Sequence, residues 1–249
     1  MEITVDQMYQ IENKGHEMGF LKKFMMENAG ASAVRRLLVK FGNLEEKIIL
    51  VFAGLGNNGG DALVMARHLA GHGARVKVIL LGCPENIKTE ESKWNWSILE
   101  KMKSVDIMSL TEFETDLKGF VDDMAADGPL PSDHDEFGDY LQVVEHEPHI
   151  IIDGILGTGI TGEIREPFAT AINRFNNLKK IDPEILTFAV DVPSGLNPQT
   201  GETANIYTKC DMTVTFHKMK QGIPKRKDLT GELFVEKIGI PPEAEIDVL

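Results

Sequence analysis

The sequence predicts an α/β protein in which helices cover both faces of a parallel sheet. Short apolar runs recur along the 249 residues, and stretches with helical periodicity lie between several of them. Three of the runs lead directly into turns rich in glycine or proline. This alternation is typical of βαβ units, whose strands are buried on both sides and therefore read as continuous apolar segments.

Each element is predicted from its own pattern. The segment up to about Phe41 reads as helix, because apolar residues recur at mixed three- and four-residue spacings, and Thr4 with Gln7 fits a capping box at its start. The strand candidates are 47–53, 75–81, 105–108, 149–153, 186–191, 212–216 and 233–236. The helical patterns between them cover 61–72, about 89–103 and 165–178.

The composition predicts a cytoplasmic protein without membrane contact. With 42% hydrophobic and 26% charged residues it resembles ordinary soluble globular proteins. No segment approaches the ~20 apolar residues of a membrane span, and the first residues lack the pattern of a signal peptide. Cys83 and Cys210 lie outside any CxxC or Cys/His cluster, which predicts small buried apolar residues in a reducing compartment.

Most of the net charge of −13 comes from one stretch. Residues 111–147 hold twelve acids and one lysine, which gives −12 + 1 = −11 and leaves about −2 for the remainder. We expect a solvated, loop-rich acidic insertion within a single domain over 1–249, with a dock for a basic partner as the alternative. This charge argues against nucleic acid as the main partner.

The segment 54–61 reads Gly-Leu-Gly-Asn-Asn-Gly-Gly-Asp, directly after the apolar run 47–53. Glycines let backbone N–H groups approach a ligand closely, and the N-terminus of a following helix adds partial positive charge. Gly54, Gly56 and Gly59 also match the G-x-G-x-x-G pattern of dinucleotide-binding turns. The segment therefore predicts a site for a phosphate or a nucleotide.

An NAD-dependent dehydrogenase is the first alternative, and the residues beside the glycines argue against it. Such enzymes place an acidic residue at the end of the next strand to hold the ribose, whereas the segment 79–83 contains none. Asn57, Asn58 and Asp61 instead supply side-chain oxygens, which suit a hydroxylated ligand or a hard cation. The same side chains could also satisfy hydrogen bonds of the turn and the helix cap.

Two further turns leave strand ends and carry acidic residues. Asp153 opens the turn 153–162, and Asp191 opens the turn 191–201, which also contains Ser194. Because ligands of doubly wound sheets bind outside the carboxyl ends of the strands, we expect all three turns to converge on one crevice. A buried strand-end carboxylate needs a compensating partner, which could be a cation, a substrate hydroxyl, a proton or local N–H groups.

Taken together, these segments resemble the YjeF N-terminal family, and the resemblance runs from the first helix to about residue 222. The motifs that carry it are 26–30, 57–61 with 66–69, Asp153 with 157–159 and 165–167, 190–196 with 200–202, 214–216 and 220–222. As a set they are highly specific, although each one alone is weak.

The resemblance implies a Rossmann-like three-layer α/β/α sandwich with a mostly parallel central sheet, usually in a homodimer. The enzymatic members of the family are NAD(P)H-hydrate epimerases, isomerases that interconvert the R and S epimers of hydrated NADH and NADPH (NADHX and NADPHX). They bind a potassium ion beside the substrate. A non-catalytic nucleotide-binding or scaffold module of the same fold is the alternative, and the survival of the site residues here argues against it.

The family's functional positions transfer to this sequence residue by residue. The resemblance implies Asn58, Asp153 and Ser194 as potassium ligands and Asp191 as the catalytic acid/base. The reaction needs a carboxyl group that can give and take a proton, and Asp61 is the second candidate for that role. The implied substrate contacts are Asn57, Asn58, Gly59, Gly60, Asp61, Gly157, Thr158, Gly159, Ile160, Thr161, Gly162, Glu163 and Asp191.

The departures from the family pattern are modest. Ala62 stands where Gly is usual, and Glu12 stands where the first helix often has Asp, both outside the motif core. The dehydratase domain that follows in many bacteria is expected to be absent, because too few residues remain after residue 222.

Overall fold

Seven parallel strands form the central sheet in the computed structural model, which describes residues 2–115, 148–159 and 162–249. Their spatial order is β4 (Val105–Ser109), β3 (Arg75–Leu80), β2 (Ile48–Ala53), β5 (Ile150–Gly154), β6 (Leu186–Val190), β7 (Met212–Phe216) and β9 (Glu232–Glu236). All seven match the predicted strands to within one residue at either end. Continuous apolar runs thus marked inner strands such as β5, β6 and β7, which are buried on both faces, whereas the edge strands β4 and β9 are only partly buried.

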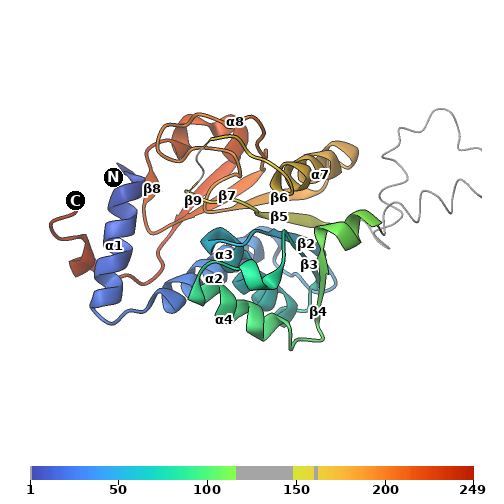
Figure 1. Ribbon diagram of the computed structural model, residues 1–249, viewed down its shortest axis with the longest axis horizontal. Helices are drawn as coiled ribbons and strands as arrows, with labels where there is room; N and C mark the ends of the chain where they lie inside the picture. The colour runs from blue at the N-terminus through green and yellow to red at the C-terminus, as the bar shows by residue number, and fades with distance from the viewer. Residues whose placement is uncertain (1, 116–147, 160–161) are drawn as a thin grey trace, which may run out of the picture.

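Helices cover both faces of this sheet, so the predicted three-layer α/β/α sandwich is confirmed (Figure 1). On one side lie α2 (Lys22–Phe41), α3 (Asn57–Gly71) and α4 (Glu90–Leu99), and on the other α7 (Phe168–Ile181) and the short α8 (Lys227–Thr230). Side chains of β2 alternate between the two cores: Val51 packs in the core under α2 and α3, whereas Phe52 meets Phe175 of α7 edge-on at 6.1 Å.

The N-terminal helical segment is divided into two helices. α1 (Val5–Glu17) ends before Gly19, whose φ of +96° turns the chain into α2. The predicted capping box at its start is confirmed, because the Thr4 hydroxyl accepts from Gln7 N (3.0 Å) and the Gln7 amide oxygen accepts from Thr4 N (2.9 Å).

α3 begins at Asn57, four residues before the predicted start at residue 61. The glycine turn itself forms the first helical turn, because Gly59 lies directly against Gly54. A Cβ on Gly59 would come within 1.8 Å of the Gly54 carbonyl oxygen. The glycines therefore bring the helix N-terminus right up to the strand end.

A second, two-stranded parallel sheet joins β1 (Glu2–Ile3) to β8 (Met219–Lys220), with Ile3 opposite Lys220. Near α1 lies the 3-10 helix η3 (Pro242–Glu245), and two more such helices are η1 (Pro84–Asn86) and η2 (Ile223–Lys225). Figure 1 shows α1 beside both chain ends, next to β8. This pairing fixes the start of α1 to the segment that follows β7.

Other expectations have mixed outcomes. Cys210 is buried as predicted, whereas Cys83 is exposed in the turn after β3.

Residues 116–147, most of the predicted acidic insertion, lie outside the described residues. Before them, Glu114 pairs with Arg174 of α7 through two hydrogen bonds of 2.7 Å. In the described ranges, none of the helices combines the length and the apolar character needed to cross a membrane.

Replacing Gly30 by Ala should destabilise the protein by about 1–3 kcal/mol, the usual effect of overpacking. A Cβ at Gly30 would lie 2.5 Å from Val64 Cγ1 and 2.9 Å from the Asp61 carbonyl oxygen, so α2 and α3 would have to separate. Gly71→Ala is the control: nothing lies within 4 Å of a Cβ there, and we expect a neutral effect or a gain of up to about 1 kcal/mol. Urea unfolding of both variants measures the difference, and equal midpoints would contradict the prediction.

Candidate active site

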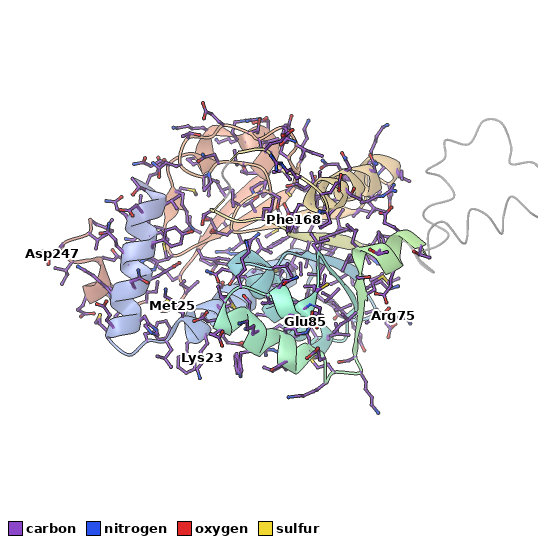
Figure 2. The ribbon with its side chains drawn as sticks, in the orientation of Figure 1. Lys23, Met25, Arg75, Glu85, Phe168 and Asp247 are labelled. Atoms are coloured by element: carbon purple, nitrogen blue, oxygen red, sulfur yellow. The ribbon has the colours of Figure 1, made fainter. Side chains whose placement is uncertain are left out.

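A cavity of about 850 Å³ opens where β2, β5 and β6 end. The first turn of α3, the turn after β5 and the first residue after β6 all line it, so the predicted convergence of the three turns is confirmed. Met25 of α2 and Phe168 at the start of α7, both labelled in Figure 2, add apolar walls. The arrangement follows from parallel strands, whose carboxyl ends share one edge of the sheet.

Most residues that the sequence predicts as substrate contacts line this cavity. They are Asn57, Asn58, Asp61, Gly157, Thr158, Gly159, Gly162, Glu163 and Asp191. Gly59 and Gly60 are buried behind this lining, where a Cβ on Gly60 would come within 2.3 Å of Ser92 Oγ. Ile160 and Thr161 lie outside the described residues.

Asp153, near the end of β5, is completely buried and accepts four hydrogen bonds. Ser194 donates from its backbone N–H (2.8 Å) and its hydroxyl (2.5 Å), Thr208 Oγ1 donates at 2.6 Å, and Ile155 N at 3.1 Å. Burial raises the pKa of the Asp153 carboxyl, and these donors lower it. The carboxyl thus ties the turns after β5 and β6 to the segment around Thr208.

Asn58 lies next to this buried cluster. Its side-chain amide donates to Leu156 O (3.1 Å), and Leu156 N donates to Ser194 Oγ (2.9 Å). Asn58 Oδ1 is buried without a hydrogen-bond partner among the described residues. Hydrogen bonds through Leu156 thus link Asn58 to Ser194, which binds Asp153 directly, and a buried amide oxygen without a partner among the described residues suits a hard cation.

Asp191 forms an ion pair with Lys220 at the wall of the cavity. Lys220 Nζ lies 2.6 Å from Asp191 Oδ1, with only 2% of the lysine side chain and 14% of the aspartate side chain exposed. The same oxygen accepts from Thr215 Oγ1 (2.8 Å) and Phe216 N (3.2 Å). Within the described part of the chain no residue donates to Asp191 Oδ2, which leaves that oxygen available to a ligand.

The backbone at Asp191 is held in an uncommon conformation. Its φ is +62°, in the left-handed region that few residues other than glycine, asparagine and aspartate adopt. Val192 N donates to Val190 O (2.7 Å) across it, so the chain reverses sharply at the strand end. Such strain at a cavity wall is typical of functional positions.

Two more carboxyl groups face the ion pair. Burial raises the pKa of Asp61 well above its ordinary value, and the charges of Asp191 and Glu12 raise it further while Lys220 lowers it. Burial likewise raises the pKa of Glu12 to about 7, with Lys220 lowering it and Asp191 raising it. The cavity thus holds carboxyl groups that retain protons near neutral pH, as acid–base sites do.

Sequence reasoning missed the site contributions of Glu12, Lys220 and Tyr9. Glu12 was placed outside the motif core, and Lys220 belongs to a matched motif but received no role. Tyr9 lines the cavity and hydrogen-bonds Thr158 (2.9 Å between the hydroxyl oxygens). The usable signal was the helical stripe Val5, Met8, Tyr9, Glu12, whose spacing places these four side chains on one face of α1.

Comparison with known proteins identifies the family. Residues 22–222 match the family described as YjeF-related protein N-terminus. The chain belongs to this family. The motifs that carry the resemblance, from 26–30 to 220–222, all lie inside that range.

Two relatives are similar in sequence to this chain over its full length. The NAD(P)H-hydrate epimerase of Nitrosopumilus maritimus is 65% identical over 249 residues, which are 100% of both chains. That of Cenarchaeum symbiosum is 54% identical, also over 100% of both. The bifunctional NAD(P)H-hydrate repair enzyme Nnr of Pyrobaculum aerophilum is 39% identical over 99% of this chain, which spans 43% of that enzyme.

A solved structure supports the fold. The crystal structure of yeast ynu0 superposes with a TM-score of 0.71 at 25% sequence identity, covering 98% of this chain and 91% of that one.

Asp61→Asn should raise the melting temperature at pH 8 and have little effect at pH 4. The pKa of Asp61 is raised in the folded state, so protonation stabilises the fold fully below the ordinary value of 3.8, and this stabilisation is lost as the pH rises toward the raised value. Asparagine cannot ionise and avoids that loss. Calorimetry should show the variant's advantage growing with pH, at roughly 2–4 °C per kcal/mol.

The control for this comparison is Asp106→Asn, at an exposed strand position outside the cavity. Its melting temperature should follow that of the unmodified protein at every pH. An Asp61→Asn advantage that is equal at pH 4 and pH 8 would contradict the assigned pKa direction.

Proposed function

We infer that the protein is an NAD(P)H-hydrate epimerase, an isomerase that interconverts the R and S epimers of NADHX and NADPHX. One observation carries this conclusion: enzymes with that name share 65% and 54% of its residues over the full length. The geometry is consistent with it, because Asn58, Asp61 and Asp191 line one cavity. A scaffold module that had lost the chemistry would have no need to keep these polar groups together.

The chemistry requires a proton to be given and taken at one ring carbon. In the hydrated cofactor a hydroxyl group sits on the carbon beside the ring nitrogen. Protonation of that hydroxyl lets the nitrogen lone pair expel water, and addition of water from the other face inverts the centre. Asp191 is the proposed acid/base residue, because it lines the cavity and none of the described residues donates to its Oδ2.

The phosphates and riboses would lie along the glycine-rich turns. The N-terminus of α3 begins at Asn57 and presents backbone N–H groups and partial positive charge to the cavity. The turn from Gly157 to Glu163 lines the same wall. The hydrated ring would then lie near Asp191, which lines the same cavity.

Potassium is the proposed cofactor, with Asn58, Asp153 and Ser194 as its ligands. The unpartnered Asn58 Oδ1 supports this assignment, since a buried amide oxygen without a donor otherwise loses hydrogen-bond energy. The bound ion would supply positive charge beside the substrate phosphates. A homodimer and a cytoplasmic location stay predictions from the family resemblance and the composition.

The purified protein should convert R-NADHX to the S epimer, and Asp191→Asn should lower kcat by about 10²–10⁴-fold. Asparagine tolerates a positive φ, so the variant keeps the turn at residue 191 while losing the acid/base group. Chromatographic separation of the epimers measures the rate, with Asp106→Asn as a surface control. A variant with the unmodified rate would remove Asp191 from the mechanism, and an inactive unmodified protein would overturn the function.

Exchange of potassium for choline at constant ionic strength should lower the epimerisation rate, and added KCl should restore it. Asn58→Ala should lose that response, because it removes the unpartnered oxygen. The measurement is the initial rate as a function of K⁺ concentration in both proteins. Equal rates in choline and in potassium would exclude the proposed cofactor.

A further inference from the structure

Helix α1 forms one wall of the cavity. Val5, Met8, Tyr9 and Glu12 all line it, and their spacing of three, one and three residues places them on one helical stripe. Met8, Ile11 and Gly15 form the neighbouring buried stripe. Glu12 therefore lies at the boundary between the packed core and the cavity.

Several contacts fix α1 in this place. The pairing of Ile3 with Lys220 joins the residues before α1 to the strand that carries the lysine of the ion pair. Gln7 donates to Val248 O (2.9 Å), and Tyr9 reaches Thr158 across the mouth of the cavity. A side chain on a helix anchored at several points is held more precisely than one on a loop.

Glu12 faces charged groups from every element around it. Lys220 comes from β8, Asp191 from the end of β6, and Lys22 from the start of α2. Asp61 of α3 also interacts with Glu12 electrostatically. Burial outweighs the two lysines and brings the Glu12 pKa to about 7, the range in which a group can both give and take a proton at neutral pH.

The carboxyl of Asp191 is already engaged on one side, because its Oδ1 accepts from Lys220, Thr215 and Phe216. Asp61 is a less suitable proton donor, because its strongly raised pKa makes its proton hard to release. Glu12, on the helical wall of the same cavity, is therefore the better candidate for a proton donor.

We propose that Glu12 is a second catalytic acid/base residue, which protonates the hydroxyl of the hydrated ring while Asp191 serves as the base. This inference rests on the proposed epimerase function. The Glu12 carboxyl gives its proton to the hydroxyl, the carbon–oxygen bond breaks with its electron pair leaving on water, and the ring-nitrogen lone pair forms the carbon–nitrogen double bond.

The second half of the reaction returns the ring to its neutral form. Water adds to the other face, the carbon–nitrogen double bond returns its electron pair to the nitrogen, and Asp191 accepts the proton of the added water. Proton exchange with solvent then returns Glu12 to its protonated form and Asp191 to its carboxylate form. In the opposite direction the two residues exchange roles, and no oxidant or further reactant is needed.

The test compares Glu12→Gln with Glu12→Asp and with Glu17→Gln, a matched substitution at the exposed end of the same helix. Initial rates of R-to-S conversion are measured from pH 5.5 to pH 9, with KM and kcat separated. We expect Glu12→Gln to lower kcat by about 100-fold or more with KM within a few-fold. Glu12→Asp should keep a titrating carboxyl and a substantial part of kcat, and Glu17→Gln should be unchanged.

The pH profile separates a catalytic role from a structural one. Because the protonated Glu12 is the active form, kcat of the unmodified protein should fall above about pH 7, and this limb should vanish in Glu12→Gln and persist in Glu12→Asp. A Glu12→Gln variant that retains kcat, or that loses activity while the fall in kcat above pH 7 persists, overturns the proposed role of Glu12 and leaves the proposed epimerase function standing. Loss of folding in Glu12→Gln leaves the decision to Glu12→Asp. A shifted limb together with a reduced kcat would support the role, whereas an absent limb, or an unshifted limb with the kcat of Glu17→Gln, would overturn it.

Discussion

The buried carboxyl of Asp153 is the constraint on which the site depends. It lies near the end of the central strand β5 and is completely buried, so a carboxyl without donors would be strongly unfavourable there. All four of its donors come from loops, two of them from Ser194 alone. Satisfying this one group therefore fixes the turn after β5 against the turn after β6, and the positions of Asp191 and of the Gly157 segment follow from it. A catalytic site built from three loops gains the rigidity of a packed core in this way.

The elements that could be predicted are those whose pattern comes from burial alone. The seven parallel strands, of which the inner ones are buried on both faces, leave seven apolar runs, and parallel strands bring their carboxyl-end turns to one edge. β1 and β8 could not be found, because two-residue strands carry no periodicity. Glu12 was missed for a related reason: one acid on an amphipathic helix reads as a solvated position, and only the tertiary placement of α1 turns it toward the cavity. The early start of α3 depends on Gly59 touching the Gly54 backbone, which is a contact rather than a local propensity.

Three carboxyl groups of the cavity have fewer positive charges around them than full ionisation would require. Glu12, Asp61 and Asp191 lie around one buried lysine, Lys220, and a second lysine, Lys22, acts on Glu12, so full ionisation would give −3 + 2 = −1 in a partly buried space. Repulsion between like charges and desolvation both resist that state. Lys220 pairs with Asp191, and the other two carboxyl groups respond by retaining protons. An acid and a base can thus coexist in one cavity, because the protein divides its carboxyl groups between two environments.

The boundary of the site extends beyond the boundary of the family match. That match begins at residue 22, yet α1 ends at Glu17 and still supplies four lining side chains. The pairing of β1 with β8 explains how this is possible, since it places the first residues of the chain beside Lys220, close to the end of the match. A helix that enters the site from outside the shared motifs can change its chemistry without disturbing the glycine turns. The proposed proton transfer and the proposed nucleotide binding therefore depend on different elements of the fold, the first on α1 and the second on the turns of the sheet.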